Sequence, residues 1–264
     1  LVIGAEGNAG KRGSAVIRAM DESKMCKTKI VKLKERIEST RVYKIIPIEL
    51  PDGFRTDLNY SSRTGKGVAM ECLPTKEGLL VGVLLVKPTD EETCLKLSDP
   101  KKLREYLDSD FPMFSKMVSD ENVEKVAKSK FSGLPNFQYA GGALHLGSCA
   151  GLIGDAIHTV KPYFGMGVNS AFEDVTVLEE CIENAKGDSK IFLPLYSKKR
   201  AADAKALVEI SHGFDGGFLT FVLPLILDSI FHRIAPWLFM PNTIQMLQKD
   251  DWSFVRTSRR KRFD

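Results

Sequence analysis

The sequence is poor in the residues that build metal centres and disulfide frameworks. Among its 264 residues there are only five cysteines and four histidines, and neither type shows the spacing of a metal site. We therefore expect no metal ion. The cysteines are scattered and odd in number, which indicates free thiols in a reducing compartment, each a small buried side chain: Cys26, Cys72, Cys94, Cys149 and Cys181.

A strong charge imbalance and long apolar runs are missing as well. The net charge of +4 is small, and no basic stripe interleaved with aromatic residues is present, so we expect no nucleic-acid binding. The cleanest apolar run, from Phe218 to Leu227, is too short to span a bilayer. With 43% hydrophobic and 27% charged residues, the composition is that of a globular protein with one large domain or two smaller ones.

What the sequence does contain is a succession of strand-like and helix-like segments. Apolar periodicity and turn residues predict strands at 1–7, 41–50, 67–75, 78–88 and 143–156, the middle three as antiparallel neighbours. The same signals predict helices at 14–20, 98–112, 120–131 and 169–187, with further helices after Gly187. Residues 21–40 fit either a helix or an exposed strand. This order indicates an α+β or mixed α/β fold with a helical C-terminal part.

The segment "GDAIHTVKPYFGMGVNSAFED", residues 154–174, concentrates glycine, proline and acidic residues directly before a helix. Gly154 lets the backbone turn, so that Asp155 projects a carboxylate suited to a sugar or polyol hydroxyl. Pro162 stiffens the loop. Backbone N–H groups from Gly165 to Asn169 then open the helix, whose positive dipole end favours an anionic or electron-rich group.

The small residues of this segment let a flat ligand approach the backbone closely. In the helix that follows, we expect one face to carry Ala171, Val175, Leu178 and Ile182. His158 has the chemistry of a general base, but we interpret it as a loop residue hydrogen-bonded to the backbone. The segment therefore predicts a ligand site without a defined catalytic residue.

The same segment resembles the second FAD-binding motif of the class A flavoprotein monooxygenases, which reads GDAxHxxxPxxGxGxNxxxED. "LVIGAEGNAGKRGSAVIR" resembles their middle motif, GADGxxSxVR, with an insertion and with Glu6 in the place of aspartate. Within this superfamily the chain is most similar to the kynurenine 3-monooxygenase family. The segments "YKIIPI", "FLPLYSKKRAADA" and "FHRIAPWLFMPNTIQM" extend the similarity over nearly the whole chain, in the same order.

The resemblance implies an FAD-binding fold of the para-hydroxybenzoate hydroxylase type. The superfamily's opening GxGxxG fingerprint is absent here, and Leu1 begins inside a strand-like segment. We therefore expect the first βαβ unit to lie upstream, in a part of the gene product outside this sequence. The expected division is the remainder of the FAD domain at 1–40 and 142–190, an antiparallel substrate sheet with helices at 41–141, and a helical region at 191–264.

The resemblance also implies roles for single residues. Asp155 would bind the ribityl chain of FAD, Gly165 to Asn169 would face the isoalloxazine, and Pro162 would line the ring. Glu6 and Gly7 would lie near FAD and the path of the nicotinamide nucleotide. The full implied set for the cofactor is Glu6, Gly7, Gly154, Asp155, Pro162, Gly165, Met166, Gly167, Val168 and Asn169.

The residues expected to contact the substrate are mostly apolar: Tyr163, Phe164, Met166, Phe214 and Phe254. Met166 replaces the family's glutamine, and Phe214 and Phe254 fall near its C-terminal asparagine and tyrosine. These changes remove hydrogen bonds that would hold an amino-acid substrate. We therefore expect a small aromatic or apolar substrate, less polar than kynurenine.

By resemblance, the expected function is that of an FAD-dependent monooxygenase that uses NAD(P)H and O₂ to hydroxylate an aromatic ring. The alternative is a non-catalytic subunit with a flavoprotein fold, held in a larger complex that is membrane-bound or not. A partner chain would then cover the side from which the first βαβ unit is missing.

Residues 214–240 are strongly apolar, contain Trp237, and are followed by the basic segment "RTSRRKR". They fit either buried helices over the active site or a surface in peripheral contact with a membrane. The expected location is intracellular and membrane-associated, at the mitochondrial outer membrane by resemblance or at another organelle membrane.

Overall fold

The computed structural model describes residues 1–7, 15–23, 27–34, 40–65, 68–76, 79–162, 165–215, 222–247 and 253–261. The backbone forms two units: Leu1–Glu35 together with Pro135–Asp264, and Arg36–Leu134. The second unit is therefore an insertion in the sequence of the first.

A mixed sheet in the first unit brings the start of the chain beside the glycine-rich segment. β1 (Val2–Gly4) pairs in parallel with β10 (Ala150–Leu152), and β10 pairs antiparallel with β9 (His145–Leu146). The helix α1 (Ala15–Glu22) follows β1, close to the predicted position. The strand expected at 143–156 is thus two short strands joined by a turn.

A second small sheet of this unit is antiparallel. β8 (Gln138–Gly141) lies between β2 (Lys29–Lys32) and β11 (His158–Thr159). Part of the segment that fitted either helix or strand is therefore a strand.

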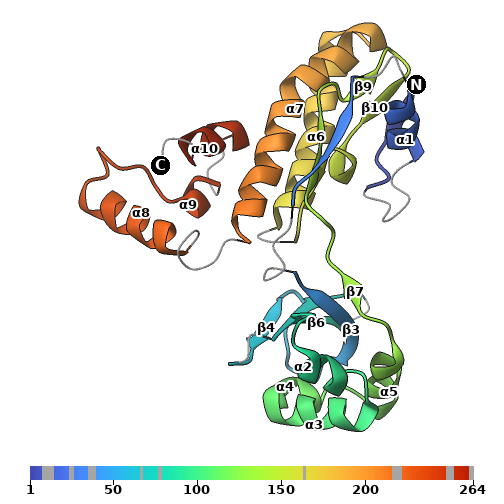
Figure 1. Ribbon diagram of the computed structural model, residues 1–264, viewed down its shortest axis with the longest axis vertical. Coiled ribbons are helices and arrows are strands. Elements are labelled where there is room, and N and C mark those ends of the chain that lie inside the picture. Colours follow the sequence, from blue (N-terminus) through green and yellow to red (C-terminus); the bar gives the residue numbers. More distant parts are fainter. Residues whose placement is uncertain are drawn as a thin grey trace. The chain divides into compact units, whose positions relative to one another are not determined.

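Two long helices dominate the first unit. α6 (Met166–Asn184) and α7 (Ser189–Gly213) lie side by side (Figure 1). Lys186 and Gly187 follow α6 with φ angles of 52° and 81°, a left-handed conformation that ends a helix and that glycine adopts without strain. The predicted end of this helix is confirmed, whereas its start lies three residues earlier than expected, at Met166.

The expected apolar face of α6 is wrong in part. Leu178 is buried, but Val175 and Ile182 are 51% and 38% exposed. Val168 and Phe172 extend this exposed stripe by one turn toward the start of the helix, with exposed fractions of 57% and 68%. The helix packs through a neighbouring face instead, which includes Leu178 and Cys181.

The predicted helical C-terminal part is confirmed as α8 (Leu223–Ile234), α9 (Thr243–Leu247) and α10 (Phe254–Lys261). α10 packs on α7, where the amide of Val255 donates to Asp203 Oδ1 at 3.2 Å. α8 has no buried residue. In the described part of the chain, no helix is both long and apolar enough to cross a membrane.

The second unit is built on one antiparallel sheet in the order β4-β5-β6-β3-β7. Its strands are β3 (Val42–Glu49), β4 (Tyr60–Arg63), β5 (Ala69–Pro74), β6 (Leu79–Val86) and β7 (Ser132–Gly133). The three strands predicted as antiparallel neighbours are confirmed as β5, β6 and β3. β4 and β7 carried no clear sequence signal.

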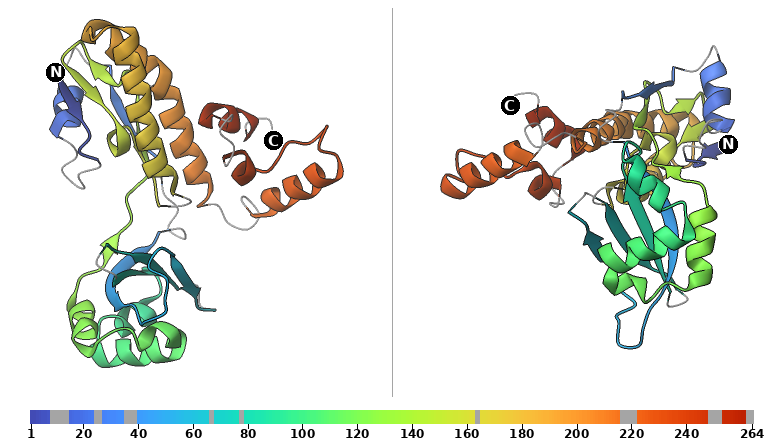
Figure 2. Two further views of the ribbon diagram at one scale, coloured as in Figure 1. Left: turned by 180° about the vertical axis from the view of Figure 1, so that it is seen from behind. Right: turned by 60° about the horizontal axis from the view of Figure 1, so that its bottom comes forward.

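Helices cover one face of this sheet (Figure 2): α2 (Glu91–Lys96), α3 (Pro100–Asp110), α4 (Pro112–Ser115) and α5 (Asp120–Lys128). Asp99 caps α3 by accepting from the Lys102 amide at 2.9 Å. The alternating burial of β6 places every second side chain in the core between sheet and helices.

A buried lysine stabilises the packing of these helices. Lys44 is 2% exposed, and its Nζ donates to the carbonyls of Leu97, Val126 and Ala127, each at 2.9 Å. These carbonyls lie at the C-terminal ends of α2 and α5, where a cation is favoured. Burial lowers the pKa of Lys44.

Candidate functional site

Three segments that the sequence predicts to bind one ligand lie together around Asp155. A Cβ atom built on Gly7 would be 3.7 Å from Asp155 Cβ, and one built on Gly167 would be 3.9 Å from Asp155 Oδ1. The middle motif, the glycine-aspartate turn and the first turn of α6 therefore meet at one place.

The turn that carries Asp155 is a short 3₁₀ helix, Gly154–Ala156. Gly154 has a φ angle of 64°, which favours glycine. The Ile157 amide donates to the Gly154 carbonyl at 2.8 Å, and Thr159 Oγ1 donates to the Asp155 carbonyl at 2.7 Å. Asp155 is exposed on one side, while the protein packed against it raises the pKa of its carboxyl despite the opposing effect of His158.

The start of α6 presents backbone rather than side chain. Gly165, with a φ angle of 67°, is its N-cap, and no side chain caps this helix within the described residues. A Cβ on Gly167 would be only 3.1 Å from Val160 Cγ2. The first N–H groups of this 19-residue helix therefore lie beside the Asp155 carboxylate. The space around them would be filled by side chains if Gly165 and Gly167 were larger residues. These features fit a flat, electron-rich group attached to a polyol chain, as in FAD.

Glu6, which the resemblance places near the cofactor, makes a hydrogen bond to the start of α1. Its Oε2 accepts a hydrogen bond from the Val16 amide at 3.3 Å, in the first turn of α1. The residue is exposed. Glu6 therefore stabilises the start of α1, and Gly7, directly after it, makes the close approach to Asp155.

A buried charged cluster beneath the turn was missed by the sequence analysis. Asp174 is fully buried, and its Oδ2 accepts from the Gly154 amide and from His158 Nε2, both at 2.8 Å. Its Oδ1 accepts from Arg200 Nε at 2.7 Å. Burial alone would raise the pKa of Asp174, but the hydrogen bonds from His158 and Gly154 and the charge of Arg200 lower it.

The interpretation of His158 as a loop residue bonded to the backbone is wrong. It lies in β11, is fully buried, and pairs with the Asp174 side chain. Its Nδ1 atom has no hydrogen-bond partner within the described residues. The acidic pair that ends the motif, Glu173 and Asp174, is the sequence signal that could have revealed this partner.

The other residues of the motif differ in exposure. Pro162, Gly165, Val168 and Asn169 are exposed, whereas Met166 is 7% exposed. Tyr163 and Phe164 lie outside the described residues.

The remaining expected substrate residues are brought together in one apolar cluster. Met166 and Phe214 are buried in it, and Phe254 at the start of α10 packs against it. The other buried members are Phe137, Val160, Leu207, Val208 and Ile210.

A second buried ion pair borders this cluster and was also missed. Lys161 Nζ lies 2.5 Å from Asp215 Oδ2, with side chains 1% and 5% exposed. The same Nζ lies 5.0 Å from the centre of the Phe137 ring. A charged pair is therefore held at the edge of an otherwise apolar environment.

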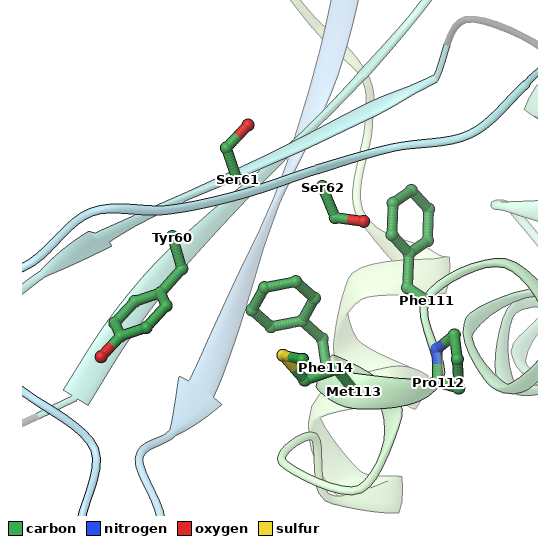
Figure 3. A pocket seen from close by; sticks show the side chains of 7 residues that line it. All are labelled: Tyr60, Ser61, Ser62, Phe111, Pro112, Met113 and Phe114. Atoms are coloured by element: carbon green, nitrogen blue, oxygen red, sulfur yellow. The ribbon is translucent and has the colours of Figure 1, made fainter.

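The second unit contains a separate pocket of about 240 Å³ between β4 and α4. Ser62 points toward Phe111 and Phe114, Ser61 points to the other side of β4, and Tyr60 lies on the same side as Ser62 (Figure 3). The remaining lining residues are Phe111, Pro112, Met113 and Phe114. None of the residues that the sequence predicts for a ligand lines it.

Comparison with known proteins finds similarity to an FAD binding domain in the first unit. Residues 150–211 match the model of an FAD binding domain. Kynurenine 3-monooxygenase 2 of Aspergillus niger is 28% identical over 183 residues, which are 64% of this chain and 37% of that protein. The chain spans less than two fifths of the length of the first curated relatives it matches.

Solved structures show the same fold. PqsL, a probable FAD-dependent monooxygenase from Pseudomonas aeruginosa, is 22% identical with a TM-score of 0.51, covering 81% of this chain and 55% of PqsL. HpxO of Klebsiella pneumoniae, solved with FAD and uric acid, is 17% identical with a TM-score of 0.51, covering 89% of this chain and 55% of HpxO. The expected resemblance and fold class are confirmed, and the match to an FAD binding domain supports FAD as the cofactor.

Proposed function

We propose that this chain is part of an FAD-dependent monooxygenase that uses NAD(P)H and O₂ to hydroxylate a small aromatic compound. The observation that carries the proposal is the meeting of Gly7, Asp155 and Gly167 at the open start of α6, within the region similar to an FAD binding domain. The similarity to kynurenine 3-monooxygenase and to the fold of PqsL supports the class of reaction.

Each part of the site has a defined task in this proposal. The Asp155 carboxylate accepts hydrogen bonds from ribityl hydroxyls, and Gly7 and Gly167 leave room for the chain beside it. The amides that begin α6 stabilise negative charge on the ring edge. When bound, FAD supplies the transfer of electrons from NAD(P)H and the activation of O₂.

The proposed substrate is aromatic and more apolar than kynurenine. Met166, Phe214 and Phe254 belong to one apolar cluster, and none offers the amide or hydroxyl that would bind an amino-acid head group. PqsL was solved with 2-aminobenzoylacetate, an aromatic compound. Each hydrogen bond lost to a polar substrate would cost on the order of 1–3 kcal/mol.

The decisive experiment is purification of the full-length protein. It should be yellow, and Asp155→Ala should purify without the flavin absorbance while still binding added FAD at higher concentration. Apolar aromatic compounds should stimulate NAD(P)H oxidation with stoichiometric hydroxylated product. A colourless full-length protein would refute the enzyme, and tight, coupled turnover of kynurenine would refute the apolar substrate.

The comparisons favour the enzyme over the alternative of a non-catalytic subunit. We infer from the exposed stripe of α6, formed by Val168, Phe172, Val175 and Ile182, that this helix packs against a further part of the flavin domain or a partner chain. An exposed apolar stripe of this kind is typical of a contact surface.

We further propose that the protein contacts a membrane surface through α8 and the residues that follow it. Trp237 is 84% exposed, and Ile234 and Leu238 are 69% and 71% exposed. Exposed apolar residues with a tryptophan are typical of helices that lie in the membrane interface.

A further inference from the structure

We propose that Asp174 is a positioning residue of the flavin site, which holds the Gly154–Asp155 turn from beneath. The proposal rests on the proposed function, because it assumes that Asp155 binds the flavin. Asp174 is fully buried and acts through Gly154 rather than through contact with a ligand.

The hydrogen bonds of Asp174 constrain the turn directly. Oδ2 accepts from the Gly154 amide at 2.8 Å, and Gly154 directly precedes Asp155. The same oxygen accepts from His158 Nε2 at 2.8 Å, on the other side of the 3₁₀ turn. One carboxylate oxygen therefore joins both ends of the segment that presents Asp155.

The positive charge of Arg200 offsets the cost of burying the Asp174 carboxylate. Its Nε donates to Asp174 Oδ1 at 2.7 Å, and another of its nitrogens donates to Ser170 Oγ at 3.0 Å. Asp174 and Ser170 lie on α6 and Arg200 on α7. The turn is thus anchored to both long helices through the buried ion pair of Asp174 and Arg200. Removing either partner would leave the other charge buried and uncompensated.

Asparagine cannot replace this carboxylate. In Asp174→Asn, the amide has two orientations. In one, its oxygen accepts from Gly154 and His158 and its NH₂ group faces the Arg200 donor. In the other, its oxygen accepts from Arg200 and its NH₂ group faces the Gly154 and His158 donors. Either orientation places donor against donor. Glu173→Gln is the matched control, because Glu173 contacts the same guanidinium at 3.0 Å with a side chain that is 51% exposed.

The test is a double-mutant cycle on FAD affinity in the full-length protein, with Asp155→Ala as the second change. Asp174→Asn should raise the FAD dissociation constant at least about tenfold when Asp155 is present, by disturbing its position. In the Asp155→Ala background the same change should have less than about a threefold effect. Equal effects in both backgrounds, or no effect in either, would overturn the proposal.

Two further measurements keep the proposal testable if Asp174→Asn does not fold. His158→Gln keeps an N–H donor for Asp174 and should retain FAD affinity, whereas His158→Leu should lose it. In the protein without flavin, His158→Leu should also speed hydrogen exchange of the Gly154 amide relative to Glu173→Gln. Failure of the wild type to bind FAD would refute the proposed function, whereas unchanged Gly154 exchange would refute the positioning role.

Discussion

Lys161 Nζ lies 2.5 Å from Asp215 Oδ2, and both side chains are almost completely buried. Lys161 directly precedes Pro162 of the predicted flavin loop, and Asp215 directly follows Phe214 at the end of α7. The pair therefore ties the loop to α7 beside the apolar cluster that contains Met166 and Phe214.

Lys161→Met should destabilise the protein by about 3–5 kcal/mol, because it leaves the Asp215 carboxylate buried without this cation. Adding Asp215→Asn should recover much of the loss. Urea unfolding of the single and double variants measures both effects. Lys199→Met is the control, since Lys199 pairs with Glu180 at 3.1 Å in a half-exposed position and should cost less than about 1 kcal/mol. Equal losses for the two lysine variants would contradict this prediction.

The parts of the site that the sequence predicts are those set by local chemistry. Gly154 and Gly165 adopt the left-handed backbone that only glycine adopts freely, so their roles follow from residue type and spacing. The antiparallel strands β3 and β6 follow from apolar alternation and turn residues in the same way.

The missed features depend on packing between distant segments. Asp174 and Arg200 are 26 residues apart, and Lys161 and Asp215 are 54 apart, so no local pattern connects them. The face of α6 was mispredicted because an apolar stripe was equated with the core. Val175 is apolar but exposed, and periodicity alone does not say which apolar stripe is covered.

Asp174 should contribute to stability in a pH-dependent way. Its pKa is lowered in the folded protein by His158, Arg200 and Gly154 against the effect of burial. A lowered carboxyl pKa gives stability that is full above the unfolded-state value near 3.9 and is lost as pH falls through the folded-state value. The stability difference between wild type and Asp174→Asn should therefore be large at pH 7 and shrink below about pH 4. Chemical unfolding of both proteins across this pH range measures the stability difference. A difference that stays constant with pH would contradict the prediction.

Gly167→Ala should separate flavin binding from stability. Its Cβ would lie 3.9 Å from Asp155 Oδ1 and 3.1 Å from Val160 Cγ2, which narrows the space beside the carboxylate. We expect weaker FAD binding, by about tenfold or more. The free energy of unfolding should change by no more than about 1 kcal/mol, because alanine favours the helix while Val160 must shift.

Gly165→Ala is the comparison variant for Gly167→Ala. Gly165 has a φ angle of 67°, so alanine there should cost about 1–2 kcal/mol of stability. Flavin titration measures the FAD affinity of both variants, and thermal unfolding measures their stability. Unchanged FAD affinity in Gly167→Ala would place the cofactor away from the start of α6.

The exposed apolar residues of α8 and of the segment that follows it should bind lipid. Ile234 and Trp237 are 69% and 84% exposed, and burying such a side chain in the interface is worth about 1.5–3 kcal/mol. Ile234→Ser and Trp237→Ser should each lower partitioning into phosphatidylcholine vesicles by roughly tenfold in sedimentation assays. Binding of the wild type should strengthen with anionic lipid, because Arg233 in the last turn of α8 adds electrostatic attraction. Met113→Ser is the control, since Met113 is 62% exposed on α4 of the other unit and should leave partitioning unchanged. If Ile234→Ser and Trp237→Ser sediment with vesicles as well as the wild type does, the apolar surface that they belong to faces another protein segment instead.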